Sequence, residues 1–111
     1  MAYSISISLQ RKQLSLRRDN KVIKKYSIAI GKKETPTPPG HFTIINKVPN
    51  PGGFYGAVWM GLSKPHYGIH GTNNLASIGK EVSKGCIRMY NKDILELSKL
   101  ITVGTSVIIT A

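Results

Sequence analysis

YSISISL, residues 3–9, alternates between larger apolar or aromatic side chains and serines along its whole length. This period of two is typical of a β-strand with one buried face, because successive side chains point to opposite sides of a strand. Working outward, residues 14–17 and 22–31 continue in extended, largely alternating patterns on either side of a polar turn at residues 18–21. The first third of the chain therefore predicts an antiparallel meander without a helical period.

Shorter apolar segments follow, separated by turns rich in proline and glycine. Residues 32–40 hold three of the six prolines and predict a loop rather than a regular element. Strands are expected at residues 41–48, 57–62, 67–70, 85–89 and 107–109, with irregular structure at 71–84.

One helix is predicted near the C-terminus. Asn91 is a suitable N-cap, and Asp93 lies in the first turn, where the helix dipole favours an acid. An apolar stripe follows at helical spacing, made of Ile94, Leu97, Leu100 and Ile101. These patterns predict a mainly β fold, a small β-sandwich or barrel with one short helix, in a single domain spanning residues 1–111.

The composition limits the class of protein. Hydrophobic residues make up 41% of the chain and charged residues 19%, a balance that argues against wholesale disorder. The single cysteine excludes an internal disulfide and a four-cysteine zinc site. Sixteen Lys and Arg against five Asp and Glu give a net charge of +11, which should attract a polyanion. Nucleic acid, an anionic cell-wall polymer and membrane headgroups all remain candidates.

The sequence has no segment close to the roughly 20 apolar residues of a membrane-spanning helix. Its first residues alternate in polarity, whereas the core of a secretory signal is a continuous apolar run. Because the chain begins with Met and continues directly into a strand, we expect a complete protein without a leader. Such a protein would be made in the cytoplasm and exported by an unknown route.

Cys86 is the candidate nucleophile, in the segment SKGCIR, residues 83–88. A lone cysteine is often a small buried hydrophobe, and that alternative stays open on the local sequence. Gly85 allows close approach of a ligand, and the cations Lys84 and Arg88 should lower the thiol pKa and populate the thiolate. The context favours a reactive cysteine about as much as a structural one.

A nucleophilic cysteine needs a base, and the chain offers His41, His66 and His70. His70 lies sixteen positions before Cys86, at the end of an expected strand and directly before a glycine. None of the five acidic residues pairs obviously with His70, so a backbone carbonyl could orient its ring instead. Spacing alone leaves open which histidine contacts the cysteine.

Two motifs together resemble the signature of the YkuD family of L,D-transpeptidases, of the ErfK, YbiS, YcfS and YnhG type. One is HGTN, residues 70–73, and the other is SKGCIR, residues 83–88, in the family's order and spacing. The segment TPTPPGHF, residues 35–42, looks like the family's Thr-Pro-x-Gly-x-Phe motif. The likeness runs from about residue 4 to residue 110 and implies the family's mainly β sandwich, with the cysteine at the end of a cleft.

The resemblance implies a role for each motif residue. Cys86 would form a thioester with the donor peptide, His70 would take the thiol proton, and the Gly71 carbonyl would orient the imidazole. The other motif positions would shape the pocket, bind substrate or stabilise the oxyanion, and they are Arg88, Ser83 and Gly85. Backbone N–H groups around Gly85 and Cys86 are the candidate oxyanion donors. No cofactor and no metal are implied.

Several nearby residues have open roles. Many family members carry a histidine where this chain has Lys84, and the roles of Lys84, His66 and His41 are not assigned. The aromatic residues Tyr55, Trp59 and Tyr67 precede His70 and either line the cleft or belong to the core.

For this family the donor is a peptidoglycan tetrapeptide stem. The resemblance implies attack on the carbonyl of the third residue, a diamino acid, followed by release of D-alanine and transfer of the acyl group to an acceptor amine. Water as acceptor would give an L,D-carboxypeptidase instead. The resemblance also implies covalent inhibition by carbapenem-type β-lactams and a place in the cell wall or spore envelope of a bacterium.

Two non-catalytic alternatives are retained. The basic charge alone would suit a nucleic-acid-binding β domain, but aromatic residues do not cluster on a basic strand and the two motifs would stay unexplained. We therefore expect no specific nucleic-acid partner. A wall-binding module with a decayed site is the other alternative, and it predicts that Cys86 is never labelled.

Overall fold

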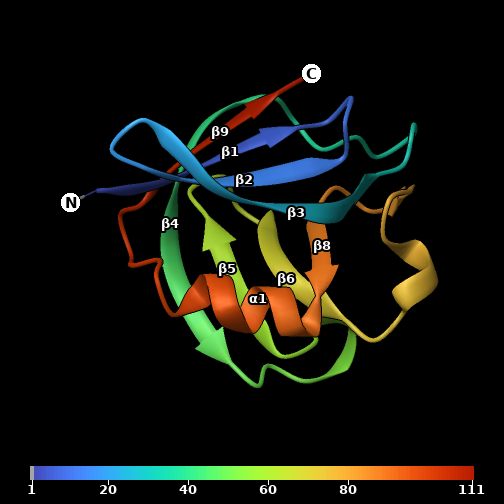
Figure 1. Cartoon of the computed structure of the whole chain (residues 1–111). Coiled ribbons are helices and arrows are strands. Elements are labelled where there is room, and N and C mark those ends of the chain that lie inside the picture. The colour runs from blue at the N-terminus through green and yellow to red at the C-terminus, as the bar shows by residue number, and fades with distance from the viewer. Residues whose placement is uncertain (1) are drawn as a thin grey trace.

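The computed structural model describes residues 2–111 and is mainly β (Figure 1). The described strands are β1 (Tyr3–Ser8), β2 (Gln13–Arg18), β3 (Lys21–Gly31), β4 (Gly40–Pro49), β5 (Val58–Leu62), β6 (Gly68–Thr72), β7 (Glu81–Ser83), β8 (Ile87–Tyr90) and β9 (Ser106–Thr110). The described helices are the 3-10 turns η1 (Gly53–Tyr55) and η2 (Leu75–Ser77) and the α-helix α1 (Asn91–Ser98). The predicted mainly β fold with one short helix near the C-terminus is confirmed.

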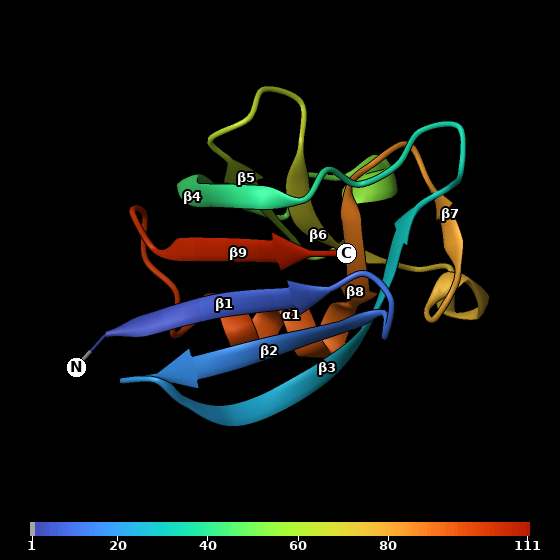
Figure 2. The same ribbon diagram turned by 90° about the horizontal axis from the view of Figure 1, so that it is seen from above.

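The strands form one sheet that curls into a closed ring. Hydrogen-bonded neighbours follow the order β2-β1-β9-β4-β5-β6-β8-β3-β7, and a β2–β3 pairing closes the ring. Figure 2 shows β3, β2, β1, β9 and β4 side by side in one layer. The layer of β4, β5, β6 and β8 faces it across the core, and α1 packs on β5, β6 and β8 (Figure 1). The two facing layers correspond to the predicted sandwich.

The alternating strands supply the core of the protein. Ile5 and Ile7 of β1 are each 1% exposed, whereas the alternating serines of the strand point away from the core. The helix adds Ile94 and Leu97, and Ile101 beyond its end is also fully buried. Burial of these side chains fixes the register of each strand, because a one-residue slip would turn the apolar set toward water.

Residues 71–84 contain more regular structure than predicted. Strand β6 continues to Thr72, η2 follows, and β7 pairs in parallel with the end of β3. The partner of β7 lies about 50 positions earlier in the chain, at Ile30 and Gly31. Such a short polar strand has no local apolar pattern, so only the long-range pairing reveals it.

The predicted cap of the helix is wrong. Tyr90 occupies the N-cap position without a side-chain hydrogen bond, and Asn91 is the first helical residue. The Asn91 amide instead ties the helix start to its surroundings, since its Oδ1 accepts the Ala57 N–H at 2.9 Å and its Nδ2 donates to Asn73. The apolar stripe also ends earlier than predicted, because Leu100 lies beyond the helix and is 37% exposed.

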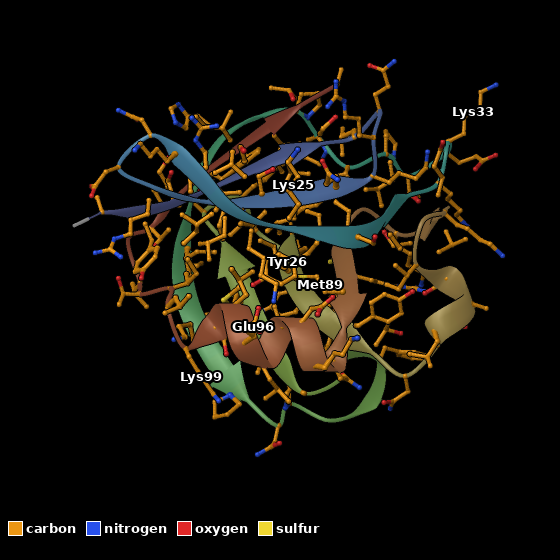
Figure 3. The ribbon with its side chains drawn as sticks, viewed as in Figure 1. Lys25, Tyr26, Lys33, Met89, Glu96 and Lys99 are labelled. Carbon is orange, nitrogen blue, oxygen red and sulfur yellow. The ribbon has the colours of Figure 1, made fainter. Side chains whose placement is uncertain are left out.

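Polar contacts from β3 and β4 anchor α1 to the sheet. The buried Tyr26 hydroxyl donates to the Glu96 carboxylate at 2.7 Å, and Lys24 pairs with the same carboxylate (Figure 3). At the C-terminal end of the helix, Lys47 Nζ of β4 donates to the carbonyls of Ser98 and Ile101. A cation at this position satisfies C-terminal carbonyls and complements the helix dipole. Among residues 2–111, no helix is long and apolar enough to cross a membrane.

Lys47→Met should lower the free energy of unfolding by about 1–2 kcal/mol, because two carbonyls lose a charged donor. Urea denaturation measures this change. Lys33→Met removes the same charge from an exposed position away from the helix and should change stability by less than about 0.5 kcal/mol. Equal losses in both variants would show that net charge, and not the cap, determines the effect.

Candidate active site

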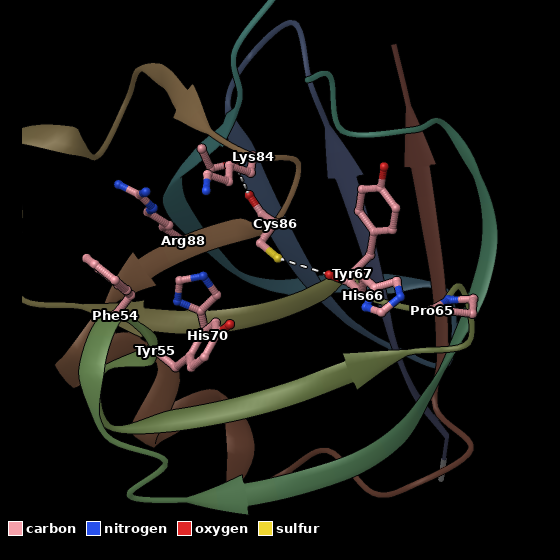
Figure 4. Close-up of a pocket in the computed structure, with 10 residues that line it drawn as sticks. Phe54, Tyr55, Pro65, His66, Tyr67, His70, Lys84, Cys86 and Arg88 are labelled. Carbon is pink, nitrogen blue, oxygen red and sulfur yellow. Dashed lines mark hydrogen bonds between the residues drawn. The ribbon is translucent and has the colours of Figure 1, made fainter. Parts of the chain in front are cut away.

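One pocket of about 550 Å³ gathers most of the residues singled out in the sequence (Figure 4). Its lining residues are Phe54, Tyr55, Pro65, His66, Tyr67, His70, Ser83, Lys84, Cys86 and Arg88. Cys86 and His70 therefore lie in the same pocket although sixteen positions separate them in the chain.

Strand register explains why these side chains meet. β6 and β8 pair in parallel with His70 opposite Arg88, and Ile69 lies opposite Ile87. The two isoleucines are buried in the core, so the residues next to them point to the opposite face. Cys86 comes directly before β8 and reaches the pocket from that strand end.

His70 is held in one tautomer. Its ring is 3% exposed, and Nδ1 lies 2.7 Å from the Gly71 carbonyl oxygen. Because a carbonyl can only accept, Nδ1 carries the proton and Nε2 is the nitrogen able to take one. Burial lowers the pKa of His70, with a smaller contribution in the same direction from Arg88, while the Gly71 hydrogen bond opposes the shift. The imidazole is thus neutral and suited to act as a base.

Two aromatic residues enclose the His70 ring. Trp59 stacks on it with ring centroids 5.8 Å apart and planes 20° apart, and Tyr55 meets both rings edge-on. Of the aromatic residues considered in the sequence, Tyr55 and Tyr67 line the pocket and Trp59 supports the histidine. β5 pairs with β6 so that Trp59 lies opposite His70. Because this pairing is not visible in the sequence, the sequence could not separate the role of Trp59 from those of Tyr55 and Tyr67.

The Cys86 thiol is partly buried, and burial raises its pKa above the ordinary value. A backbone hydrogen bond from Gly68 and the charge of Arg88 act in the opposite direction and are weaker. The sequence-based expectation of a thiol pKa lowered by flanking cations is therefore wrong in its net direction. Sγ lies 3.6 Å from the His66 carbonyl, which can accept the thiol proton as a weak hydrogen bond. The free site holds a thiol rather than a thiolate.

Ser83 and Gly85 shape the turn that presents the cysteine. The buried Ser83 hydroxyl donates to the Cys86 carbonyl at 2.6 Å and accepts the Gly85 N–H at 3.0 Å. Gly85 has φ +123°, and an added Cβ would lie 2.5 Å from the Tyr67 ring, so glycine is required there. The Gly85 N–H is engaged inside the turn, which argues against its predicted use as an oxyanion donor.

A second loop braces the same turn, and sequence reasoning missed it. Thr37, 3% exposed, accepts the Gly31 N–H at 2.9 Å and donates to the Gly85 carbonyl at 2.8 Å. Thr35 donates to the Ser83 carbonyl at 2.9 Å. The available signal was the threonine–proline segment itself, whose buried hydroxyls reach a turn 48 positions later in the chain.

Thr37→Val should slow covalent labelling of Cys86 by about tenfold or more, because small displacements at a reacting atom are costly. It should also cost about 2–3 kcal/mol of stability, since two buried backbone groups lose their partner. Labelling is measured by intact mass under conditions in which the variant is fully folded. Thr102→Val, at an exposed position, serves as the control. Unchanged labelling in a folded Thr37→Val protein would contradict the bracing role.

The remaining candidates separate into two groups. His66 and Lys84 line the pocket, whereas exposed His41 on β4 contacts Ser106, which does not line the pocket. The exposed aromatic Phe54, 88% accessible, also lines the pocket, and nothing in the local sequence marks it. A partly buried thiol that shares a pocket with a neutral, carbonyl-oriented imidazole is an arrangement that can carry out nucleophilic acyl transfer.

A family model described as the YkuD L,D-transpeptidase catalytic domain matches residues 2–109. The chain therefore belongs to this family. A Bacillus subtilis relative whose name describes it as L,D-transpeptidase YkuD is 59% identical over 107 residues, which is 96% of this chain and 65% of the relative. This chain thus spans about two thirds of that relative.

Solved structures agree with the fold. The catalytic domain of an Enterococcus faecium L,D-transpeptidase has a TM-score of 0.83 and 26% identity, covering 97% of this chain and 96% of that domain. The Ldtfm enzyme, solved as its avibactam carbamoyl form, has a TM-score of 0.88 and 26% identity, covering 100% of this chain and 49% of that chain.

Proposed function

We propose that this protein is a peptidoglycan L,D-transpeptidase with Cys86 as nucleophile. The observation that carries the proposal is the meeting of Cys86 and His70 in one pocket, with the His70 ring oriented by the Gly71 carbonyl. Membership of the YkuD family supports the reaction class and a bacterial wall substrate. The wall or the spore envelope is the proposed place of action.

In the proposed acylation step, His70 Nε2 accepts the Cys86 proton as the sulfur attacks the carbonyl of the third stem residue, a diamino acid. Collapse of the tetrahedral intermediate breaks the peptide bond, and the imidazolium returns the proton to the departing D-alanine amine. Because the resting pair is neutral, proton transfer and attack are coupled. The Cys86 N–H is the proposed oxyanion donor, since the Gly85 N–H is already bonded to Ser83.

Arg88 is the proposed substrate-binding cation. It lines the pocket opposite His70 and is partly exposed, so its guanidinium can bind a stem carboxylate through two hydrogen bonds. In the second step, an acceptor amine attacks the thioester carbonyl and His70 Nε2 accepts the amine proton. The C–S bond then breaks, and the imidazolium returns the proton to the departing Cys86 sulfur, which restores the free thiol. Attack by water on the same thioester would give L,D-carboxypeptidase activity.

Mass spectrometry of the wild-type protein with a disaccharide tetrapeptide tests the proposal. The expected adduct has the mass of the stem without D-alanine, bound at Cys86. A cross-linked dimer indicates transpeptidation, and a free tripeptide stem indicates the carboxypeptidase. We also expect a covalent adduct with a carbapenem, supported by the avibactam form of Ldtfm. Absence of every adduct from folded protein would reject the enzyme assignment and favour a binding module.

The boundaries of the functional unit are also proposed. We expect residues 1–111 to act as one catalytic domain. No cofactor or metal takes part in the proposed steps.

A further inference from the structure

The turn between β2 and β3 carries a basic hairpin, defined here as residues 17–25, which projects from the body of the protein (Figure 2). Residues 21–25 are all exposed although they belong to β3. A strand with one face on the core would alternate between buried and exposed positions. In contrast to residues 21–25, the second half of β3 is buried from Tyr26 to Gly31 at every position except Ser27. The first half of the strand therefore stands clear of the core.

The basic hairpin concentrates positive charge. It holds five of the sixteen Lys and Arg residues and one acid, Asp19. The Asp19 carboxylate accepts the Ala2 N–H at 3.0 Å, and Lys24 pairs with Glu96 on α1. Within the hairpin, Arg17 donates to the Asn20 carbonyl at 3.0 Å, and Arg18 lies over the Tyr3 ring of β1. Lys21 and Lys25 are exposed (Figure 3 labels Lys25).

Two aliphatic side chains stand among these cations. Val22 is 43% exposed and Ile23 is 49% exposed. Val22 lies opposite Arg17 and Lys24 lies opposite Leu16, so Ile23 is the extra residue of a β-bulge. The bulge places Ile23 outside the regular ladder, where its side chain contributes little to the core.

Edge protection alone accounts for only part of this pattern. The other edge of β3 pairs with β8 and β7 only at residues 28–31, so residues 21–27 have an open edge that lysines and a bulge would protect. Two exposed aliphatic residues beside the charges would, however, favour association at this open strand edge rather than prevent it. Cations next to exposed aliphatic side chains suit an anionic lipid surface, where phosphates meet the cations and the acyl boundary receives the aliphatic groups.

We propose that the basic hairpin docks on an anionic phospholipid surface. A soluble polyphosphate chain is the weaker candidate, because Val22 and Ile23 would gain nothing from it. The ten-residue path along β3 from Lys21 to Gly31 spans roughly 30 Å, and Gly31 pairs with Ser83 beside the nucleophile. The nucleophile's turn would therefore lie at the far end of β3 from the docked hairpin. The proposal does not depend on the proposed reaction.

Vesicle co-sedimentation of the full chain tests the proposal, with phosphatidylglycerol–phosphatidylcholine vesicles compared with pure phosphatidylcholine at low and high salt. Wild-type protein should bind only the anionic vesicles, and less at high salt. Lys21→Ala with Lys25→Ala should weaken binding by about 25-fold, or fivefold per cation. Val22→Ser with Ile23→Ser should weaken it by about tenfold without changing the net charge. Lys80→Ala with Lys99→Ala is the charge-matched control, and its loss should be less than about fivefold.

Three outcomes would overturn the proposal. They are no binding of wild-type protein to anionic vesicles, equal losses in the two lysine double variants, and binding only to soluble polyphosphate with no effect of the serine variants. Carbapenem labelling of Cys86 should be unchanged in all hairpin variants. If labelling failed in wild-type protein while vesicle binding followed the expected order, the proposed reaction would fail and the docking surface would stand.

Discussion

Cys86→Ala should abolish the stem adduct, the carbapenem adduct and all acyl transfer. No other residue of the chain can replace the sulfur, because Cys86 is its single cysteine. The thiol is partly buried and its hydrogen bonding is weak, so its removal should change the free energy of unfolding by no more than about 1 kcal/mol. Intact mass after exposure to each reagent, with urea denaturation in parallel, measures both effects.

Ser83→Ala is an informative partner to this variant. It keeps the sulfur but removes the hydroxyl that bonds the Cys86 carbonyl and the Gly85 N–H. We expect slower labelling of Ser83→Ala protein and none of Cys86→Ala protein. Product formation by a well-folded Cys86→Ala protein would refute the covalent mechanism.

His70→Gln should reduce the rate of Cys86 acylation by about 10² to 10⁴-fold, the usual contribution of a positioned base. Glutamine keeps a polar side chain beside the Gly71 carbonyl but cannot accept a proton at neutral pH. Single-turnover labelling with a carbapenem measures the loss. His41→Gln is the matched control and should label at the wild-type rate, because His41 lies outside the pocket lining.

The pH dependence separates a base from a merely structural histidine. Burial lowers the pKa of His70, so Nε2 should stay unprotonated and active below pH 6.5, the ordinary value. The acid limb of the wild-type kcat/KM profile should therefore lie below that pH. In His70→Gln protein, attack depends on the thiolate, whose formation is opposed by the raised pKa of Cys86. Its residual rate should keep rising above pH 9.0, the ordinary value for the thiol. A profile with the same shape in both proteins would rule out His70 as the base.

The order of strands along the chain was predictable because alternation is a local property. Residues 3–8 form β1 with its isoleucines buried, and residues 91–98 form the predicted helix. The local sequence pattern gave a wrong prediction where a side chain bonds to residues far away in the chain. Asn91 matches an N-cap in sequence, but the approach of Ala57 and Asn73 gives its amide other hydrogen bonds.

The residues of the candidate site could likewise be predicted only in part from the sequence. Residue type and motif spacing nominated Cys86, His70 and Arg88, and all three line one pocket. The roles assigned to them remain proposals. The brace formed by Thr37 was not foreseen, because its two hydrogen bonds depend on how a proline-rich loop packs against a turn far along the chain.

By itself, the sequence determined the mainly β architecture, the family motifs and the identity of the residues able to react. Tertiary structure decided that His66 and His70 share a pocket with the sulfur while His41 does not. It also decided which His70 ring nitrogen is protonated and the direction of both pKa shifts. The physical reason is that the spacing of apolar residues within one strand or helix already indicates which of its faces is buried. Desolvation and hydrogen-bond partners depend instead on groups from separate strands, as with Cys86, where burial outweighs the nearby charge of Arg88.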